Sequence, residues 1–168
     1  QVTAFPHKKL AKYEHKDWFL TSHFIGAAAI FRKDAVEALD YYRHDIIYGS
    51  EEYDLGYRAL DLGYTIAYDS SITVWHKESP KGRVTPNEKQ ALMWHNKTRI
   101  VWSFLPIKYF YTTCLLWGIR YLAKTNFDIK GFAKTLKSIV SMTKETPRTP
   151  LNPKALAYLK KVEARLWY

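Results

Sequence analysis

The feature that most constrains the fold of this chain is a change of pattern near residue 84. Before it, apolar segments are short and are separated by turn-forming residues, as in domains that mix strands and helices. After it, apolar residues recur with helical spacing, and prolines and short polar segments interrupt the runs. We therefore predict an α/β part followed by an all-helical extension, with helices at residues 87–105, 107–124, 129–144 and 154–167.

The charge of the chain divides at the same place. Residues 1–83 carry 11 Lys and Arg against 12 Asp and Glu, whereas residues 84–168 carry 15 against four. The helical part therefore contains all of the excess positive charge that gives the chain its formal net charge of +10. Such a surface is either simply solvated or binds an anionic partner: lipid headgroups, a lipid diphosphate or nucleic acid.

Composition excludes several classes of protein. A hydrophobic content of 47% excludes global disorder. The single cysteine, Cys114, excludes a disulfide framework or a cysteine-based zinc site, and it fits a reducing compartment. No apolar run reaches the roughly 18 residues that a spanning helix needs.

In the first half, patterning predicts four short strands and two helices. The strands are expected at residues 18–21, 23–31, 64–68 and 72–76, the second of them buried and rich in small residues. Asp34 and Glu37 resemble a capping box that opens one helix. The other helix is expected at residues 51–62, with Ser50 as its N-cap and Gly63 as its stop.

The second predicted helix begins with three carboxylates, Glu51, Glu52 and Asp54. The helix dipole and the free backbone N–H groups of a first turn favour ionised carboxylates. Helical spacing puts Glu51 and Asp54 on one face and lets Asp54 pair with Arg58, while Glu52 points elsewhere. Glu52 is then available for proton transfer, unless the segment is only a well-capped acidic turn.

A second candidate lies at the end of the fourth predicted strand. His76 follows an apolar run and precedes a basic loop that contains Lys77, Lys81 and Arg83. A histidine there could ligate a metal while the cations bind phosphate oxygens, or it could have a structural role alone.

In their order, these motifs resemble the C-terminal half of the catalytic domain of family 2 glycosyltransferases, which are inverting enzymes of the GT-A fold. The resemblance runs over about a third of the chain, from His23 to Glu78. It is carried by Phe24-Ile25-Gly26-Ala27-Ala28, Arg32-Lys33, Glu51-Glu52-Tyr53-Asp54-Leu55 with Arg58, Gly63-Tyr64-Thr65-Ile66-Ala67-Tyr68 and Val74-Trp75-His76. It implies a partial GT-A-like, Rossmann-like mixed sheet with helices in residues 1–83, the acceptor-side half, and a basic, aromatic-rich helical extension in residues 84–168.

The resemblance also implies roles for the acidic helix start. Glu52 occupies the position of the general base that deprotonates the acceptor hydroxyl, where the family more often has Asp. Glu51 and Asp54 would be supporting acids, and Arg58 would fix Asp54.

The metal and substrate contacts are implied in the same way. His76 would help to hold a divalent metal, Mg or Mn, together with a D-x-D region. The loop over the donor's diphosphate would contain Lys77, Lys81 and Arg83. Gly26 and Ala27 would line the pocket for the acceptor and the sugar.

The implied activity is transfer of a sugar from a nucleotide-sugar donor to a hydroxyl of a glycan or lipid-linked acceptor, in cell-surface polysaccharide synthesis. Family members carry a nucleotide-binding region and the D-x-D motif before the acceptor half, and this chain contains no D-x-D. We therefore expect a C-terminal fragment that is inactive by itself and that dimerises through an exposed sheet edge.

The helical extension has features of a peripheral membrane protein. Residues 109–121 are largely apolar, and residues 129–144 form a basic amphipathic pattern of the kind that binds anionic bilayers. We expect a cytoplasmic protein at the inner face of the cell membrane, although these helices could also be a cap on the catalytic domain. A non-catalytic module that binds membranes or nucleic acid is the alternative; the extension lacks the recognition elements of nucleic-acid-binding proteins.

Overall fold

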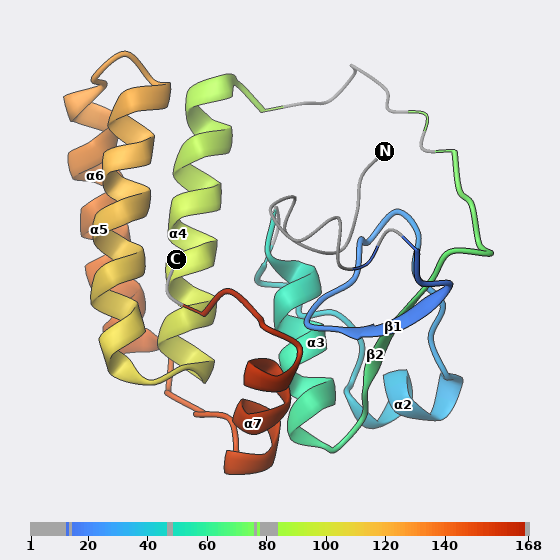
Figure 1. Ribbon diagram of the computed structural model, residues 1–168. Coiled ribbons are helices and arrows are strands. Elements are labelled where there is room, and N and C mark those ends of the chain that lie inside the picture. Colours follow the sequence, from blue (N-terminus) through green and yellow to red (C-terminus); the bar gives the residue numbers. More distant parts are fainter. Residues whose placement is uncertain (1–12, 14, 47–48, 76, 78–83, 167–168) are drawn as a thin grey trace. The chain divides into compact units, whose positions relative to one another are not determined.

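The structure is a computed structural model that describes residues 13, 15–46, 49–75, 77 and 84–166 (Figure 1). Its described elements are β1 (Trp18–Thr21), α2 (Lys33–Ala38), α3 (Glu51–Asp61), β2 (Ile66–Asp69), α4 (Pro86–Phe104), α5 (Ile107–Lys124), α6 (Ile129–Glu145) and α7 (Pro153–Lys161). Two strands with two helices between them come first and helices alone follow, so the predicted mixture of α and β is confirmed at this level. Most of the described residues are helical, and their sheet has two antiparallel strands.

The chain forms two compact units. The first, here called the sheet unit, comprises Gln1–Arg43, Glu52–Ser79 and Asn152–Ala164. The second, the helical unit, comprises His44–Glu51, Pro80–Leu151 and Arg165–Tyr168. Residues 1–83 and 84–168 are thus the main parts of the two units, but α7 groups with the sheet.

The sheet pairs two strands that are far apart in the sequence. β1 and β2 are antiparallel, with Phe19 opposite Tyr68 and Thr21 opposite Ile66. The rings of Phe19 and Tyr68 stack with their centroids 4.8 Å apart, which is the kind of cross-strand contact that stabilises a short sheet. The strand predicted at 64–68 therefore exists, shifted to 66–69, but residues 72–75 form no strand.

The prediction of a buried strand at residues 23–31 is wrong. The segment turns instead, because the N–H of Ala28 donates to the carbonyl oxygen of Ile25 at 2.9 Å. Gly26, Ala27 and Ala28 are exposed at this turn. Small side chains give a strand little to pack with, so their apolar character alone does not bury it.

The predicted capping box of α2 is also wrong. The N-cap position belongs to Arg32, which makes no side-chain cap, and Asp34 lies inside the first turn. The Asp34 carboxylate is engaged by the guanidinium of Arg32 through two hydrogen bonds. The ion pair therefore takes the carboxylate that would have capped the helix.

Helix α3 ends where the sequence predicts. Gly63 has a φ of +89°, a conformation that glycine adopts without steric cost. Its N–H donates to Leu60 O, and the N–H of Tyr64 donates to Ala59 O, at 3.1 and 3.0 Å. This pair of bonds is a Schellman motif, which turns the chain from α3 toward β2.

Helix α7 is tied to the sheet unit by two polar side chains. The N–H of Asn152 donates to Asp61 Oδ1 and its side-chain Nδ2 donates to Asp61 O, both at 2.7 Å. The hydroxyl of Tyr158 accepts from the N–H of Ile66 and lies 2.9 Å from the carbonyl oxygen of Thr21. Tyr158 thus contacts both strands of the sheet.

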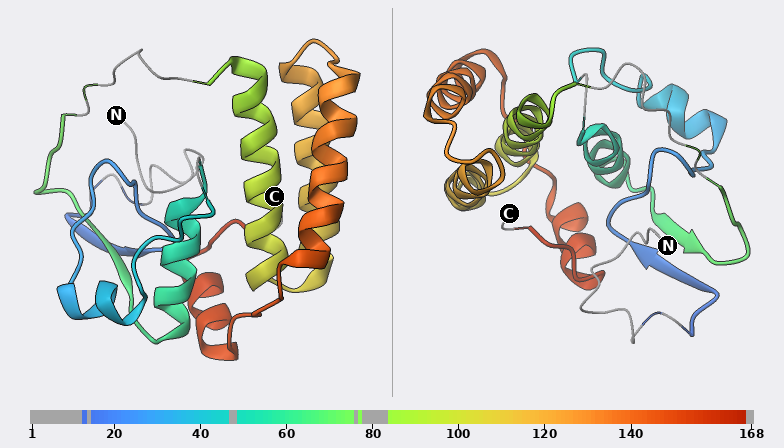
Figure 2. Two further views of the ribbon diagram at one scale, coloured as in Figure 1. Left: turned by 180° about the vertical axis from the view of Figure 1, so that it is seen from behind. Right: turned by 90° about the horizontal axis from the view of Figure 1, so that it is seen from above.

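The helical unit is built from α4, α5 and α6, and α5 and α6 lie side by side against α4 (Figure 2). Its core contains Trp94, Tyr121, Ile139 and Met142. Gly118 of α5 permits close packing, since a Cβ there would lie 3.0 Å from Cζ2 of Trp94. The limits of α4, α5 and α6 agree closely with the predicted helices because the local signals are strong: the capping box of Thr85 and Glu88, Pro106 between α4 and α5, and the N-cap Asp128.

Candidate functional site

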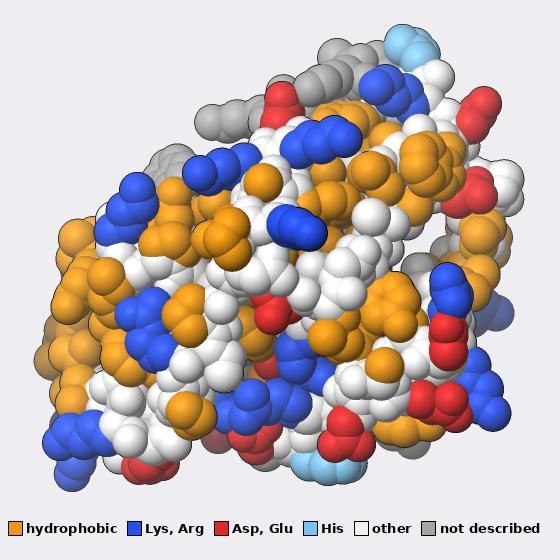
Figure 3. All heavy atoms as spheres, turned by 90° about the horizontal axis from the view of Figure 1, so that it is seen from below, with side chains coloured by type: hydrophobic (Ala, Val, Ile, Leu, Met, Phe, Trp, Pro, Cys, Tyr) orange, Lys and Arg blue, Asp and Glu red, His pale blue; other side chains and the backbone are white. Residues whose placement is uncertain are grey.

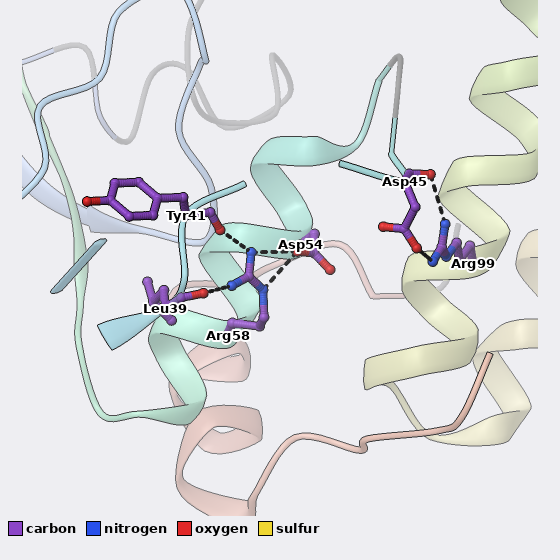
Figure 4. A network of polar contacts seen from close by, with 6 residues as sticks. All are labelled: Leu39, Tyr41, Asp45, Asp54, Arg58 and Arg99. Atoms are coloured by element: carbon purple, nitrogen blue, oxygen red, sulfur yellow. Dashed lines mark hydrogen bonds and ion pairs between the residues drawn. The ribbon is translucent and has the colours of Figure 1, made fainter. Parts of the chain in front are cut away.

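The buried acid at the start of α3 is Asp54. The residue is 2% exposed, and its Oδ2 accepts a hydrogen bond from Nε of Arg58 at 2.8 Å (Figure 4). The sequence predicted this i, i+4 pair, and the prediction is confirmed. A buried carboxylate needs such a partner, because an unpaired charge in the interior costs several kcal/mol.

Arg58 does more than neutralise Asp54. Its guanidinium also donates to the carbonyl oxygens of Leu39 and Tyr41, in the loop that follows α2. Asp40 and Tyr41 there have φ values of +52° and +57°, a left-handed conformation that L side chains rarely adopt. Bonds from Arg58 to the carbonyls on either side of Asp40 stabilise this strained turn, so one side chain fixes both α3 and the preceding loop.

Glu52 points away from Asp54 and toward the turn at Gly26. Its Oε1 accepts a hydrogen bond from the Gly26 N–H at 3.2 Å. A Cβ added at Gly26 would lie 2.8 Å from that same oxygen, so glycine at this position gives the carboxylate its room. Two segments 26 residues apart therefore meet at the Glu52 carboxylate.

The residue after Glu52 adds an aromatic contact. The ring of Tyr53 stacks on the imidazole of His23, with centroids 5.1 Å apart and planes inclined by 9°. This stacking gives a second contact between the first turn of α3 and the segment that leads to Gly26.

Glu51 opens α3 and differs from its neighbours. Its Oε2 is buried and has no hydrogen-bond partner within the described part of the chain. A buried oxygen of this kind is uncommon in folded proteins and is found at ligand sites as well as at sites filled by water.

The other predicted site residues are only partly described. Ala27 lies beside Gly26 in the exposed turn, and Lys77 is exposed. The predicted metal ligand, His76, lies outside the described residues. The same holds for two of the predicted diphosphate contacts, Lys81 and Arg83. Within residues 13–77 and 84–166, as far as they are described, no three His, Cys, Asp or Glu side chains could together hold a metal ion.

The sequence thus predicts the pairing of Asp54 with Arg58, but not the other contacts of α3. The carbonyl groups of Leu39 and Tyr41 and the ring of His23 were not predicted as contacts of α3. Backbone carbonyls carry no residue-specific signal, so only the tertiary structure could reveal the first two. His23 begins the segment that resembles a glycosyltransferase motif, and a pairing with an aromatic residue could have been considered there.

A separate group of polar residues lies on α4 in the helical unit. Arg99 donates to the carbonyl oxygen and to the carboxylate of Asp45 (Figure 4). Lys97 is buried, and desolvation lowers the pKa of its ammonium group to about 8. These groups belong to the helical unit and not to the Glu52 site.

The chain was compared with protein-family models, with curated proteins and with solved structures, and none of these comparisons found a match.

Proposed function

We propose that this chain is the acceptor-side half of an inverting glycosyltransferase of the family 2, GT-A type. It would transfer a sugar from a nucleotide-sugar donor to a hydroxyl of a glycan or lipid-linked acceptor during cell-surface polysaccharide synthesis. The observation that carries the proposal is the contact between Gly26 and Glu52. These residues belong to two separate motifs of the resemblance, and a pocket that contains the general base requires such motifs to meet.

In the proposed reaction, Glu52 is the general base. Its carboxylate takes the proton of the acceptor hydroxyl as the oxygen forms a bond to the anomeric carbon of the donor sugar. The bond from that carbon to the nucleoside diphosphate breaks on the opposite face, which inverts the configuration. A base positioned in this way contributes roughly 10² to 10⁴-fold to the rate.

The surroundings of Glu52 support this role. Its Oε1 is held by a backbone N–H, and the helix that presents it is anchored by the ion pair of Asp54 and Arg58. A fixed carboxylate loses little freedom when the acceptor binds. Asp54 is already paired and buried, so we propose a positioning role for it and for Arg58.

The donor side of the proposal extends beyond the described residues. Two parts of the donor site stay predictions. One is the set of phosphate contacts by Lys77, Lys81 and Arg83. The other is a divalent metal (Mg or Mn) held by His76 with a D-x-D region. The described residues alone offer no metal site, so we derive no step through a metal. In this proposal the enzyme acts at the cytoplasmic face of the cell membrane, where lipid-linked acceptors are available.

The test is made in the complete polypeptide with its nucleotide-sugar donor. We expect Glu52→Gln to lower kcat by about 10² to 10⁴-fold, because the amide cannot accept the proton. The free energy of unfolding should stay close to that of the wild type. Glu37→Gln, which changes an exposed acid of α2, is the matched control and should leave kcat unchanged.

A second variant tests the geometry. Gly26→Ala places a methyl group against Glu52 Oε1 and should displace the carboxylate, so kcat should fall although Glu52 is still present. If Glu52→Gln keeps most of the activity, Glu52 is not the base. If the complete polypeptide transfers no sugar at all, the alternative of a non-catalytic binding module is favoured.

A further inference from the structure

A row of exposed apolar side chains in the helical unit lies along α5. Tyr111, Leu115 and Ile119 are 66%, 64% and 56% exposed. They follow one another at intervals of four residues, so they lie on one face of the helix. We call these three residues the apolar stripe. Gly118 and Tyr121 of the same helix are buried against the other helices.

The predicted membrane-binding helix, α6, is partly buried in the helical unit. The sequence suggested that α6 would present its apolar residues to a bilayer. Ile139 and Met142 are buried in the core instead, and Phe132 packs against Trp94 with ring centroids 4.9 Å apart. Part of the apolar face of α6 is therefore occupied within the unit, although Leu136 and Val140 of the same helix remain exposed.

Both α5 and its neighbour α6 carry exposed cations. Helix α5 contains Lys108, Arg120 and Lys124 and no acidic residue. The exposed side chains of α6 add Lys130, Lys134, Lys137 and Lys144, while Glu145 is the one acid within that helix. Figure 3 shows hydrophobic side chains along the edge of the molecule where α5 and α6 lie, with Lys and Arg side chains beside them.

We infer that the apolar stripe of α5 is a docking face for an anionic bilayer, with the stripe inserted at the level of the lipid headgroups and the cations of α5 and α6 on the lipid phosphates. An apolar face with flanking lysines is typical of helices that lie in the interface of a membrane. None of the described helices is long and apolar enough to cross a membrane, so α5 would lie in the plane of the surface.

Charge favours a bilayer over a second copy of the chain as the occupant. Two copies that met through α5 would bring two sets of cations together, and like charges at an interface are unfavourable. An anionic surface neutralises the same cations, and each adds about 1 kcal/mol of attraction near the membrane. This inference does not depend on the proposed enzymatic activity, because it uses no residue of the Glu52 site.

The experiment measures binding of the 168-residue chain to vesicles of phosphatidylcholine with about 30% phosphatidylglycerol, whose negative surface attracts cations. We expect binding to these vesicles, and much weaker binding to pure phosphatidylcholine. Ile119→Ser should lower the coefficient for partition of the chain from water to the vesicles by about tenfold, since it removes most of one inserted apolar side chain. Ile30→Ser is the matched control: Ile30 is 81% exposed but belongs to the sheet unit, and its loss should not change binding.

A second measurement separates insertion from adsorption. An environment-sensitive dye at position 115, on a Leu115→Cys and Cys114→Ser background, should shift to shorter wavelength on anionic vesicles. If wild type and Ile119→Ser bind the vesicles equally, the inference that the apolar stripe inserts is wrong. It is also wrong if the dye emission does not shift on anionic vesicles. A dimer in solution that Ile119→Ser dissociates, with no vesicle binding, would overturn the inference in favour of self-association.

Discussion

The ion pair of Asp54 and Arg58 offers the sharpest test of how the candidate site is held. We consider Arg58→Met, which keeps much of the aliphatic length of the side chain and removes its charge and its donors. The variant loses the bond to the Asp54 carboxylate and the bonds to the carbonyl oxygens of Leu39 and Tyr41.

The expected cost follows from burial. Asp54 is 2% exposed, so without Arg58 its charge remains in the interior and loses the guanidinium that pairs with it. Removing one partner of a buried pair costs about 3 to 5 kcal/mol, whereas exposed pairs contribute at most about 1 kcal/mol. The freed carbonyl of Tyr41 can turn to water, because its residue is exposed. We therefore expect about 3 kcal/mol, near the lower end of that range.

The assay is urea unfolding followed by circular dichroism, with Arg32→Met as the matched control. Arg32 forms a similar ion pair with Asp34, but both side chains are largely exposed, so the control should unfold almost as the wild type does. The double variant Asp54→Asn with Arg58→Met should be more stable than Arg58→Met alone, because it leaves no unpaired charge. A loss below about 1 kcal/mol for Arg58→Met would show that Asp54 is not held as the structure indicates.

Two further predictions concern the helical unit. Because burial lowers the pKa of Lys97 from 10.5 to about 8, the unfolded chain binds more protons than the folded chain between these values, and the free energy of unfolding should rise with pH across that range. Urea unfolding at pH 8, 9 and 10 should show this rise in the wild type relative to Lys97→Met, and parallel curves for the two proteins would contradict the buried position of the ammonium group. Gly118→Val should destabilise the protein by about 1 to 3 kcal/mol, since its Cβ meets the rings of Trp94 and Phe132. Ala123→Val, on the exposed side of α5, is its control, and equal thermal unfolding of the two variants would argue against this close packing.

The helix limits were largely predictable because their signals are local. Helix α5 begins after Pro106 and ends at Lys124 as expected, and α3 ends before Gly63. Helix α7 is the exception, since it ends at Lys161 and not near Trp167. The N–H of Ala164 donates to Leu159 O, and Glu163 has a φ of +56°, so the helix ends with a left-handed residue. Because that residue is not a glycine, the sequence does not indicate the end of the helix.

For the candidate site, the sequence predicted which carboxylates share a face of α3, because helical geometry alone determines that relation. It did not predict that Glu52 Oε1 would meet the Gly26 N–H, because residues 23–31 were expected to form a strand. A contact between residues 26 positions apart depends on the path of the intervening chain, and small side chains carry little information about that path.

The sequence by itself determined the helices of the second half, their caps and their excess of positive charge, since each of these depends on residues a few positions apart. The tertiary structure decided which strands pair, that α7 joins the sheet unit through Asn152 and Tyr158, and which face of α5 remains exposed. An apolar helix face has the same pattern whether it packs on a neighbour or meets a lipid surface. Only the three-dimensional packing of α4, α5 and α6 separates these two cases, because it shows which apolar side chains already have a partner.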